Sequence, residues 1–146
     1  DTIIRSEVTK MAVTAMGMEK AAESSKGNRD YLDVAPEHWA NGYINVATSL
    51  GLVEGDGDGN FRPNDKITYR EAVAIMVRAT GYENIAQNKG GYPRGYITVA
   101  GENNMLSDVE GSAEKEISRG NERKNLITFF LKTLEICEKI YYNSDT

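Results

Sequence analysis

The chain has 146 residues, which is long enough to bury one hydrophobic core. Charged residues make up 27% of it and the net charge is −5, so no general positive field attracts nucleic acid or an anionic membrane. No apolar run approaches the length of a membrane-spanning helix, and we expect no membrane insertion. The single cysteine, Cys137, excludes an internal disulfide and a cysteine-based metal cluster, and we expect it to be a buried thiol.

Residues 1–17 are predicted to form a helix, because apolar residues recur there at the spacing of one helical face. These residues are Val8, Met11, Ala12, Ala15 and Met16. Gly17 is suited to end the helix, whereas Ile4, which stands where a threonine would cap the first turn, has no side-chain oxygen for its amides. Residues 18–30 are polar and rich in small side chains, so we predict a connector there.

The middle of the chain, residues 31–82, is predicted to be a helix, a glycine-rich turn and a second helix. Pro36 fits the first turn of the first helix. Trp39 is expected to anchor that helix in the core rather than to serve as a platform for a sugar. Gly51 is expected to end the helix, after a buried face that continues through Tyr43, Val46, Ala47 and Leu50.

The second helix of this segment has a clear start and end. Thr68 and Glu71 have the spacing of a capping box, in which each residue binds a free amide of the first turn. Gly81 is expected to end the helix. Its predicted buried face consists of Ala72, Val73, Met76, Val77 and Ala79.

The glycine-rich turn between these helices carries Asp56, Asp58 and Asn60 at the spacing that opens a calcium-binding EF-hand loop. However, Phe61 replaces the glycine that such a loop requires, and Ile67 stands where a bidentate glutamate is needed. We therefore expect no metal site here. The turn is instead expected to expose backbone amides that border a ligand groove.

The pattern of the middle segment begins again after a second predicted connector, residues 82–89. Tyr92 and Tyr96 fall 53 residues after Trp39 and Tyr43. Repetition at such a period is typical of an array in which neighbouring units bury their faces on each other.

The last part of the chain completes this copy. Ile117 follows Ile67 by only 50 residues, so the predicted turn of this copy is three residues shorter. Ser118 then opens a last predicted helix. Its apolar face consists of Leu126, Phe130, Leu134, Cys137 and Tyr141.

Arg5 and Arg119 are the leading candidates for a binding site, because each lies in the first turn of a predicted helix. The helix dipole disfavours a cation there by a few tenths to about 1 kcal/mol, unless the arginine and the helix amides bind the same anion. Arginine also offers a planar fork that grips a carboxylate with two hydrogen bonds. The alternative is that both arginines are solvated or form salt bridges within the protein.

The middle segment departs from this pattern. Tyr69 takes the position of the arginine, and Arg70 is displaced by one residue, about 100° around the helix. A groove at Tyr69 could bind ligand only weakly, could offer the Tyr69 ring for stacking on a sugar, or could have a purely structural role. We favour the structural role.

The sequence offers no catalytic constellation. His38 is the only histidine and has no second histidine or cysteine with which to form a metal site or a triad. The acidic residues show no paired spacing that would place a proton donor opposite a base. We expect neither enzymatic activity nor a cofactor.

The middle segment resembles an S-layer homology repeat, the wall-anchoring module of many bacterial surface proteins. The resemblance rests on fixed residues at fixed spacing: Asp33-Val34, His38-Trp39-Ala40, Tyr43-Ile44, Ala47, Gly51-Leu52-Val53, the turn from Gly55 to Gly59, Phe61, Pro63 and Ile67-Thr68. It implies an all-α fold in which tandem helix–turn–helix repeats pack around a shared helical core with pseudo-threefold symmetry. The implied units are residues 1–30 (the second half of a first repeat plus a connector), 31–88 (a complete repeat) and 89–146 (a repeat with a shortened turn).

The resemblance implies that the chain anchors a surface protein non-covalently to a Gram-positive cell wall, outside the cell in the wall or the S-layer. In the family the ligand is secondary cell-wall polysaccharide, often with a pyruvate ketal that supplies a carboxylate, bound in grooves between repeats. The candidate ligand-binding residues are Arg5, Arg119, Gly55, Gly57, Ser118 and Tyr69. An alternative function is a module for protein docking or for self-assembly of a surface layer.

The implied first repeat lacks its leading helix and turn, as expected of a processed or trimmed piece. We therefore expect apolar surface beside the first helix to be covered in a homodimer. We also expect the groove at Arg5 to be incomplete and the ligand to be held mainly near Arg119.

Overall fold

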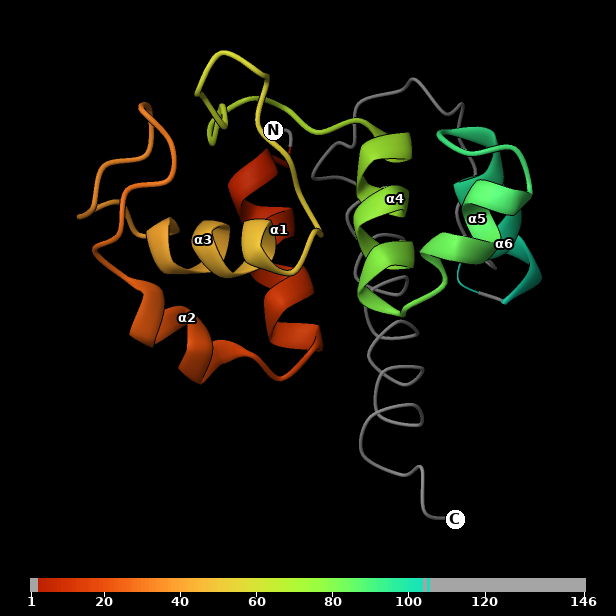
Figure 1. Ribbon diagram of the computed structural model, residues 1–146, viewed down its shortest axis with the longest axis horizontal. Helices are drawn as coiled ribbons and strands as arrows, with labels where there is room; N and C mark the ends of the chain where they lie inside the picture. The colour runs from red at the N-terminus through yellow and green to blue at the C-terminus, as the bar shows by residue number, and fades with distance from the viewer. Residues whose placement is uncertain (1–2, 104, 106–146) are drawn as a thin grey trace.

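The computed structural model describes residues 3–103 and 105, and every regular element within them is a helix (Figure 1). The helices are α1 (Arg5–Ala15), α2 (Glu19–Ser25), α3 (Asn41–Ser49), α4 (Tyr69–Ala79), α5 (Glu83–Asn88) and α6 (Arg94–Glu102). The predicted all-α class is therefore confirmed. The last predicted helix, which contains Cys137, and the shortened turn before it lie outside the described residues.

The two long helices begin with different caps. At α4 the predicted capping box is complete: Glu71 N–H donates to Thr68 Oγ1 at 3.3 Å, and Thr68 N–H donates to the Glu71 carboxylate at 3.1 Å. At α1 only one half of such a box can form, because Ile4 has no side-chain acceptor. There Ile4 N–H donates to the Glu7 carboxylate at 3.3 Å.

Both predicted connectors are wrong, because each contains a short helix. α2 lies within residues 18–30, and α5 lies within residues 82–89. Ala22 of α2 and Ala86 of α5 are buried, and these helices pack against α3 and α6 respectively. Helices this short are marginal by themselves, so packing against a neighbour stabilises them where periodicity gives little signal.

One glycine in each helix pair permits this packing. A Cβ atom built on Gly42 of α3 would collide with the carbonyl oxygen of Ala22, and one built on Gly95 of α6 would collide with that of Ala86. The same close approach thus occurs twice, at equivalent positions. Any side chain larger than a hydrogen atom would push the helices of the pair apart.

The six helices are two copies of one three-helix unit. α4 begins and ends 64 residues after α1 (69 − 5 and 79 − 15), and α5 begins 64 residues after α2 (83 − 19). α6 begins and ends 53 residues after α3 (94 − 41 and 102 − 49), which matches the predicted offset. The two registers differ because the loop before the third helix is longer in the first unit, and loops accept insertions at least cost. Figure 1 shows α1, α2 and α3 on one side, α5 and α6 on the other, and α4 between them.

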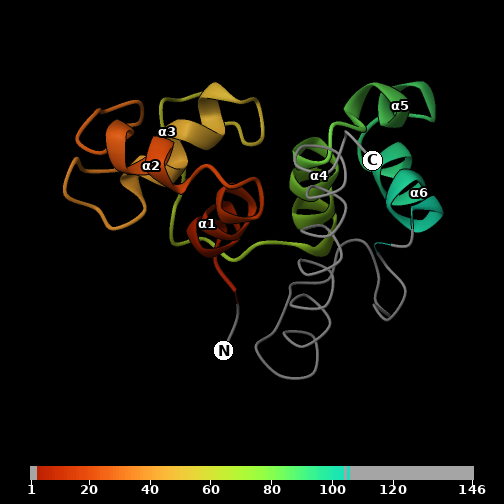
Figure 2. The ribbon, with the colours of Figure 1, turned by 90° about the horizontal axis from the view of Figure 1, so that it is seen from below.

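The packing unit does not coincide with the predicted repeat. α3 packs on α1 and α2, whereas α4 packs on α1, α5 and α6. Among the described helices α3 and α4 do not pack on each other, although together they form the predicted middle repeat. Figure 2 shows α1 facing α4 where the two units meet. Each predicted repeat is therefore held by helices of its neighbours.

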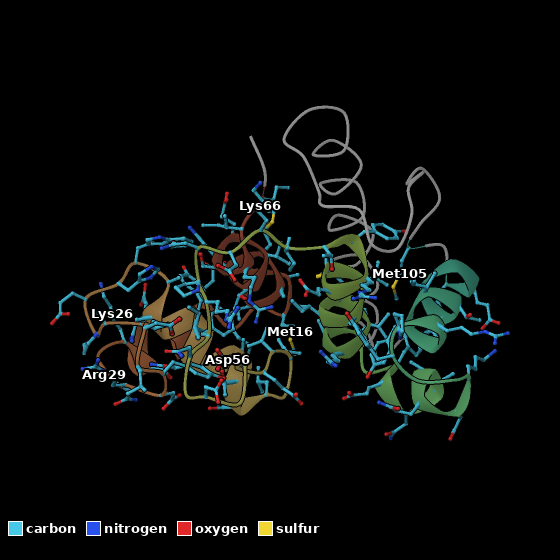
Figure 3. All side chains as sticks on the ribbon, turned by 90° about the horizontal axis from the view of Figure 1, so that it is seen from above. Met16, Lys26, Arg29, Asp56, Lys66 and Met105 are labelled. Carbon is cyan, nitrogen blue, oxygen red and sulfur yellow. The ribbon has the colours of Figure 1, made fainter. Side chains whose placement is uncertain are left out.

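Three predictions about the first middle helix are wrong. α3 begins at Asn41 rather than at Pro36, because residues 35–40 form a hydrogen-bonded turn instead. Trp39 lies in this turn and is 49% exposed, so it is not a core anchor. Leu50, at the far end of α3, is 42% exposed. The largest fully buried side chains come from both units, among them Ile44, Phe61, Met76, Tyr96 and Met105 (Met105 is labelled in Figure 3).

None of the helices in the described part of the chain is both long and apolar enough to cross a membrane. The pseudo-threefold arrangement stays a prediction, since the third long helix lies outside the described residues. The homodimer also stays a prediction, and sedimentation at several protein concentrations would measure it.

Candidate ligand-binding groove

Arg5 is the first residue of α1, and its side chain is held against the loop that joins α3 to α4. Its Nε donates to the carbonyl oxygen of Phe61 at 3.1 Å, and its Nη2 donates to that of Glu54 at 3.2 Å. The guanidinium also lies over the Phe61 ring, 4.7 Å from the ring centroid. These contacts fix the plane of the guanidinium, and the carbonyls do so without neutralising its charge.

The backbone at the start of α1 pairs with the end of the same loop. Arg5 N–H donates to the carbonyl of Asp65 at 2.9 Å, and Ser6 N–H donates to that of Pro63 at 3.1 Å. The first amides of α1 are therefore already bound. The expectation that these amides would hold the ligand's anion is wrong at α1, and the guanidinium is the group of this helix start that faces the groove.

Two cavities meet at Arg5, and together we call them the Arg5 groove. The first has a volume of about 350 Å³ and is lined by Arg5, Val53, Glu54, Glu71, Ala74, Ile75, Arg78 and Tyr92. The second has a volume of about 430 Å³ and is lined by Arg5, Glu54, Gly55, Asp56, Phe61, Arg62, Asp65, Lys66 and Glu71. Figure 3 shows Asp56 and Lys66, two residues of the second cavity, on the side of the molecule that carries α1 and α3.

The first cavity takes its walls from all three predicted repeats. Arg5 belongs to the first, Glu54 and α4 to the second, and Tyr92, in the loop before α6, to the third. The Tyr92 ring meets the fully buried Tyr96 ring edge-on, with centroids 6.0 Å apart. Burial raises the pKa of Tyr92 above its ordinary value of 10.0. Later parts of the chain thus supply walls for the cavity at Arg5, and the expectation of an incomplete groove there stays a prediction.

Arg78, near the end of α4, is a groove residue that carries no local sequence signal. Its Nε forms a salt bridge with Glu83 Oε1 at 3.2 Å, and its Nη1 donates to the Leu52 carbonyl at 3.3 Å. The Tyr96 hydroxyl donates to the same Glu83 oxygen at 2.8 Å. The equivalent position in α1 is Thr14 (78 − 64), so this arrangement belongs to the second unit and not to the first. Leu52 and Glu83, the partners of Arg78, lie in other segments of the chain and are brought to it only by the fold.

The glycine-rich turn is closed around Asp56. The Oδ1 atom of Asp56 accepts hydrogen bonds from Asp58 N–H at 2.9 Å and Asn60 N–H at 3.1 Å, and Oδ2 accepts one from Arg62 Nε at 3.1 Å. These bonds, that of Asp58 first, hold the pKa of Asp56 below its ordinary value of 3.8. The amides of Asp58 and Asn60 therefore bind within the turn rather than bordering the groove as expected.

The two predicted glycines of this turn differ in position. Gly55 lines the second cavity. A Cβ atom on it would lie 2.6 Å from the Tyr31 ring, so a glycine is needed for the turn to pack. Gly57 has a left-handed backbone (φ 88°) and lines neither cavity. Within the part of the chain that the structure describes, no group of acidic, histidine or cysteine side chains could hold a metal ion.

Tyr69 occupies in α4 the position that Arg5 occupies in α1 (69 − 64). It packs half-buried against the core, and burial raises its pKa above the ordinary value of 10.0. Tyr69 lines neither cavity of the groove. Ser118 and Arg119 lie outside the described residues. Of the candidate residues, the structure thus brings Arg5 and Gly55 together in one groove.

The fold defines a class of protein, the helical-repeat module, in which neighbouring repeats pack on one another. Comparison with known families makes this more specific. Residues 30–73, which hold α3, the turn and the start of α4, match the S-layer homology domain family. This part of the chain is an S-layer homology domain.

The chain is also similar to curated bacterial surface proteins. It is 37% identical over 108 residues to the middle cell wall protein of Brevibacillus brevis, across 74% of this chain and 10% of that protein. It is 31% identical over 120 residues to a cell surface protein of Thermoanaerobacter kivui, across 82% of this chain and 15% of that protein. A match to the amylopullulanase of Thermoanaerobacterium thermosulfurigenes, 36% identical, covers 60% of this chain but only 4% of that protein.

The chain thus spans only 10% and 15% of the length of these two surface proteins. The family match and these relatives indicate a location at the bacterial cell surface, and they support cell-wall anchoring as the role of the domain.

Proposed function

We propose that this chain anchors a bacterial surface protein to the cell wall by binding secondary cell-wall polysaccharide in the Arg5 groove. One observation carries the proposal: Arg5 stands where two cavities meet, with its guanidinium held by two carbonyls and an aromatic ring. A cation that the protein has already oriented loses little freedom when it binds, which favours affinity.

The free part of the guanidinium suits a carboxylate. Nε donates to Phe61 and Nη2 uses one hydrogen on Glu54, which leaves three hydrogens at the Nη1 and Nη2 end. Two of these point in parallel and match the two oxygens of a carboxylate. A sugar with a pyruvate ketal carries such a carboxylate.

The walls of the first cavity suit the rest of such a ligand. Val53, Ala74 and Ile75 supply an apolar surface beside Arg5, which can cover a methyl group of a ketal. Tyr92, on the same cavity, supplies the face of an aromatic ring for a sugar ring. A carboxylate close to an apolar group therefore fits this cavity better than a neutral sugar does.

The direct test is retention of the protein on purified wall polysaccharide. We expect binding to the polysaccharide and none to peptidoglycan from which the polysaccharide has been removed. Equal retention on both materials would contradict the proposal. Self-association without any affinity for polysaccharide would instead favour the alternative of a docking or self-assembly module.

Arg5→Ala is expected to weaken binding of the polysaccharide by roughly 1.5–3 kcal/mol, the range for a hydrogen bond to a charged group. Calorimetry measures this loss, and circular dichroism checks that the helices are intact. Arg29→Ala is the matched control, because Arg29 is exposed and bonds to Leu32, away from both cavities. Unchanged affinity in a folded Arg5→Ala variant would remove Arg5 from the site. Arg119→Ala is expected to weaken binding in the same direction.

A further inference from the structure

The Arg5 groove carries as many acidic as basic side chains. Its cations are Arg5, Arg62, Lys66 and Arg78, and its anions are Glu54, Asp56, Asp65 and Glu71. Arg62 forms a salt bridge with Asp56 at 3.1 Å, and Arg78 forms one with Glu83 at 3.2 Å. The groove is therefore not a basin of positive potential, although its central residue is an arginine.

Two acidic residues, Glu54 and Glu71, line both cavities together with Arg5, and they differ in what they do for the fold. Glu71 belongs to the capping box of α4 and accepts a hydrogen bond from Thr68 N–H. Glu54 is exposed, and its bond with Arg5 runs through its backbone carbonyl, which any side chain at this position retains. The Glu54 carboxylate can therefore be changed while the contacts that orient Arg5 are kept.

This arrangement accepts one negative charge more readily than several. A single carboxylate can pair with the guanidinium end-on and gain two charge-assisted hydrogen bonds. A polymer with a phosphate in every unit brings further charges into the groove, and these meet Glu54 and Glu71 at close range. Polyanions bind proteins tightly by neutralising many phosphates with unpaired cations, and this groove offers few of them.

We propose that Glu54 is a specificity-determining residue that restricts the groove to polysaccharides with isolated carboxylates and excludes wall polymers that carry a phosphate in every unit. The inference rests on the proposed function, because it assigns the ligand class of the same groove. Specificity of this kind comes from repulsion of the wrong ligand as much as from attraction of the right one.

The test compares the unmodified protein with Glu54→Gln and Asp58→Asn. Both substitutions remove one negative charge, but Asp58 lies on the exposed glycine turn and lines neither cavity. Two probes are used, a purified wall polysaccharide bearing pyruvate ketals and a poly(glycerol phosphate) of similar length. Affinities are measured at low salt and at about 0.15 M salt, where charges more than about 8 Å apart are screened.

We expect the unmodified protein to prefer the ketal-bearing polysaccharide. Glu54→Gln is expected to shift the ratio of the two affinities toward poly(glycerol phosphate) by about three- to fivefold at low salt, the size of one exposed charge interaction. This shift should shrink at the higher salt. Asp58→Asn is expected to leave the ratio unchanged.

The outcomes separate this inference from the function on which it rests. A protein that binds no ketal-bearing polysaccharide fails the proposed function. A protein that binds it, yet shows the same ratio with Glu54→Gln, retains that function and overturns the role of Glu54. An equal shift with Asp58→Asn would also overturn it, because net charge rather than the groove would then set the preference.

Discussion

Asp56 makes the stability of the glycine-rich turn, which lines the second cavity, dependent on pH. Its folded-state pKa lies below 3.8, because the ionised carboxylate accepts hydrogen bonds from Asp58 and Asn60 and lies beside Arg62. The stability from these bonds is fully present above the unfolded-state pKa and is lost as pH falls through the folded-state pKa. Unfolding of the turn in acid would therefore also disrupt the second cavity, which the turn lines.

The prediction is that the melting temperature of the protein falls more steeply below about pH 4 than that of Asp56→Asn. Asparagine keeps an oxygen for the two amides but has no charge to lose. Thermal unfolding of both proteins across this pH range measures the difference. Asp58→Asn, whose carboxylate has no such role in closing the turn, is expected to behave as the unmodified protein does, and parallel curves for all three would contradict the role of Asp56.

The same carboxylate leads us to predict that the turn needs no metal. Its two oxygens already bind Asp58, Asn60 and Arg62, and Phe61 and Ile67 occupy positions where a calcium loop needs other residues. We expect a chelator to leave the melting temperature unchanged. A drop of several degrees that calcium restores would show that the turn is a metal site.

Single residues differ in how far the sequence predicts them. Arg5 could be singled out, because its position in the first turn of a helix is a local property. Glu54 and Tyr92 could not, since they line the same cavity as Arg5 only because different predicted repeats pack together. Trp39 was predicted to be buried because apolar spacing continues smoothly from the preceding turn into α3. Spacing alone does not show where such a helix begins.

At the scale of elements, the helices with strong local signals were predicted and the short ones were not. The capping box of α4 and the glycines behind α1 and α4 are local features, and the structure confirms them. α2 and α5 depend on Gly42 and Gly95, which lie in other helices and permit the close approach. The close approach depends on both helices of a pair, α2 with α3 and α5 with α6. It therefore produces no apolar periodicity in α2 or α5 from which either short helix could be predicted.

Two glycine substitutions in α6 are predicted to act in opposite directions. Gly95→Ala forces a methyl group against the Ala86 carbonyl, and overpacking of this kind costs roughly 1–3 kcal/mol. Gly101→Ala meets no atom within 4 Å, so it should stabilise the protein by about 0.5–1 kcal/mol through helix propensity. Urea unfolding of the two variants measures both effects. Stabilisation by both substitutions would show that α5 does not pack closely on α6.

At the scale of the whole molecule, the repeat in the sequence and the unit of packing are different things. Residues 30–73 match one domain family, yet their helices α3 and α4 pack on α1 rather than on each other. Periodicity shows which face of a helix is buried but not which helix covers it. The helical periodicity could therefore be predicted from the sequence, whereas the interlocking of the helices and the groove between them could not.

A ligand in a groove shared by three repeats should stabilise all of them together. At a free concentration of a hundred times Kd, binding adds about 2.7 kcal/mol to the free energy of unfolding. We expect the wall polysaccharide to raise the melting temperature in a single cooperative transition. Arg5→Ala should cut this stabilisation to about half or less at the same concentration, and a rise that is not reduced by the substitution would place the ligand elsewhere.

The joint between the two three-helix units has a mechanical consequence. The loop of residues 50–68 is the covalent link between them, and the Arg5 groove lies along it, with α1 on one side and α4 on the other. A polysaccharide seated there touches both units at once. If the polysaccharide binds there as proposed, a pull on the surface protein would load this joint, and the units could not separate without first releasing the polymer. The bound polymer would then hold the two three-helix units together under tension.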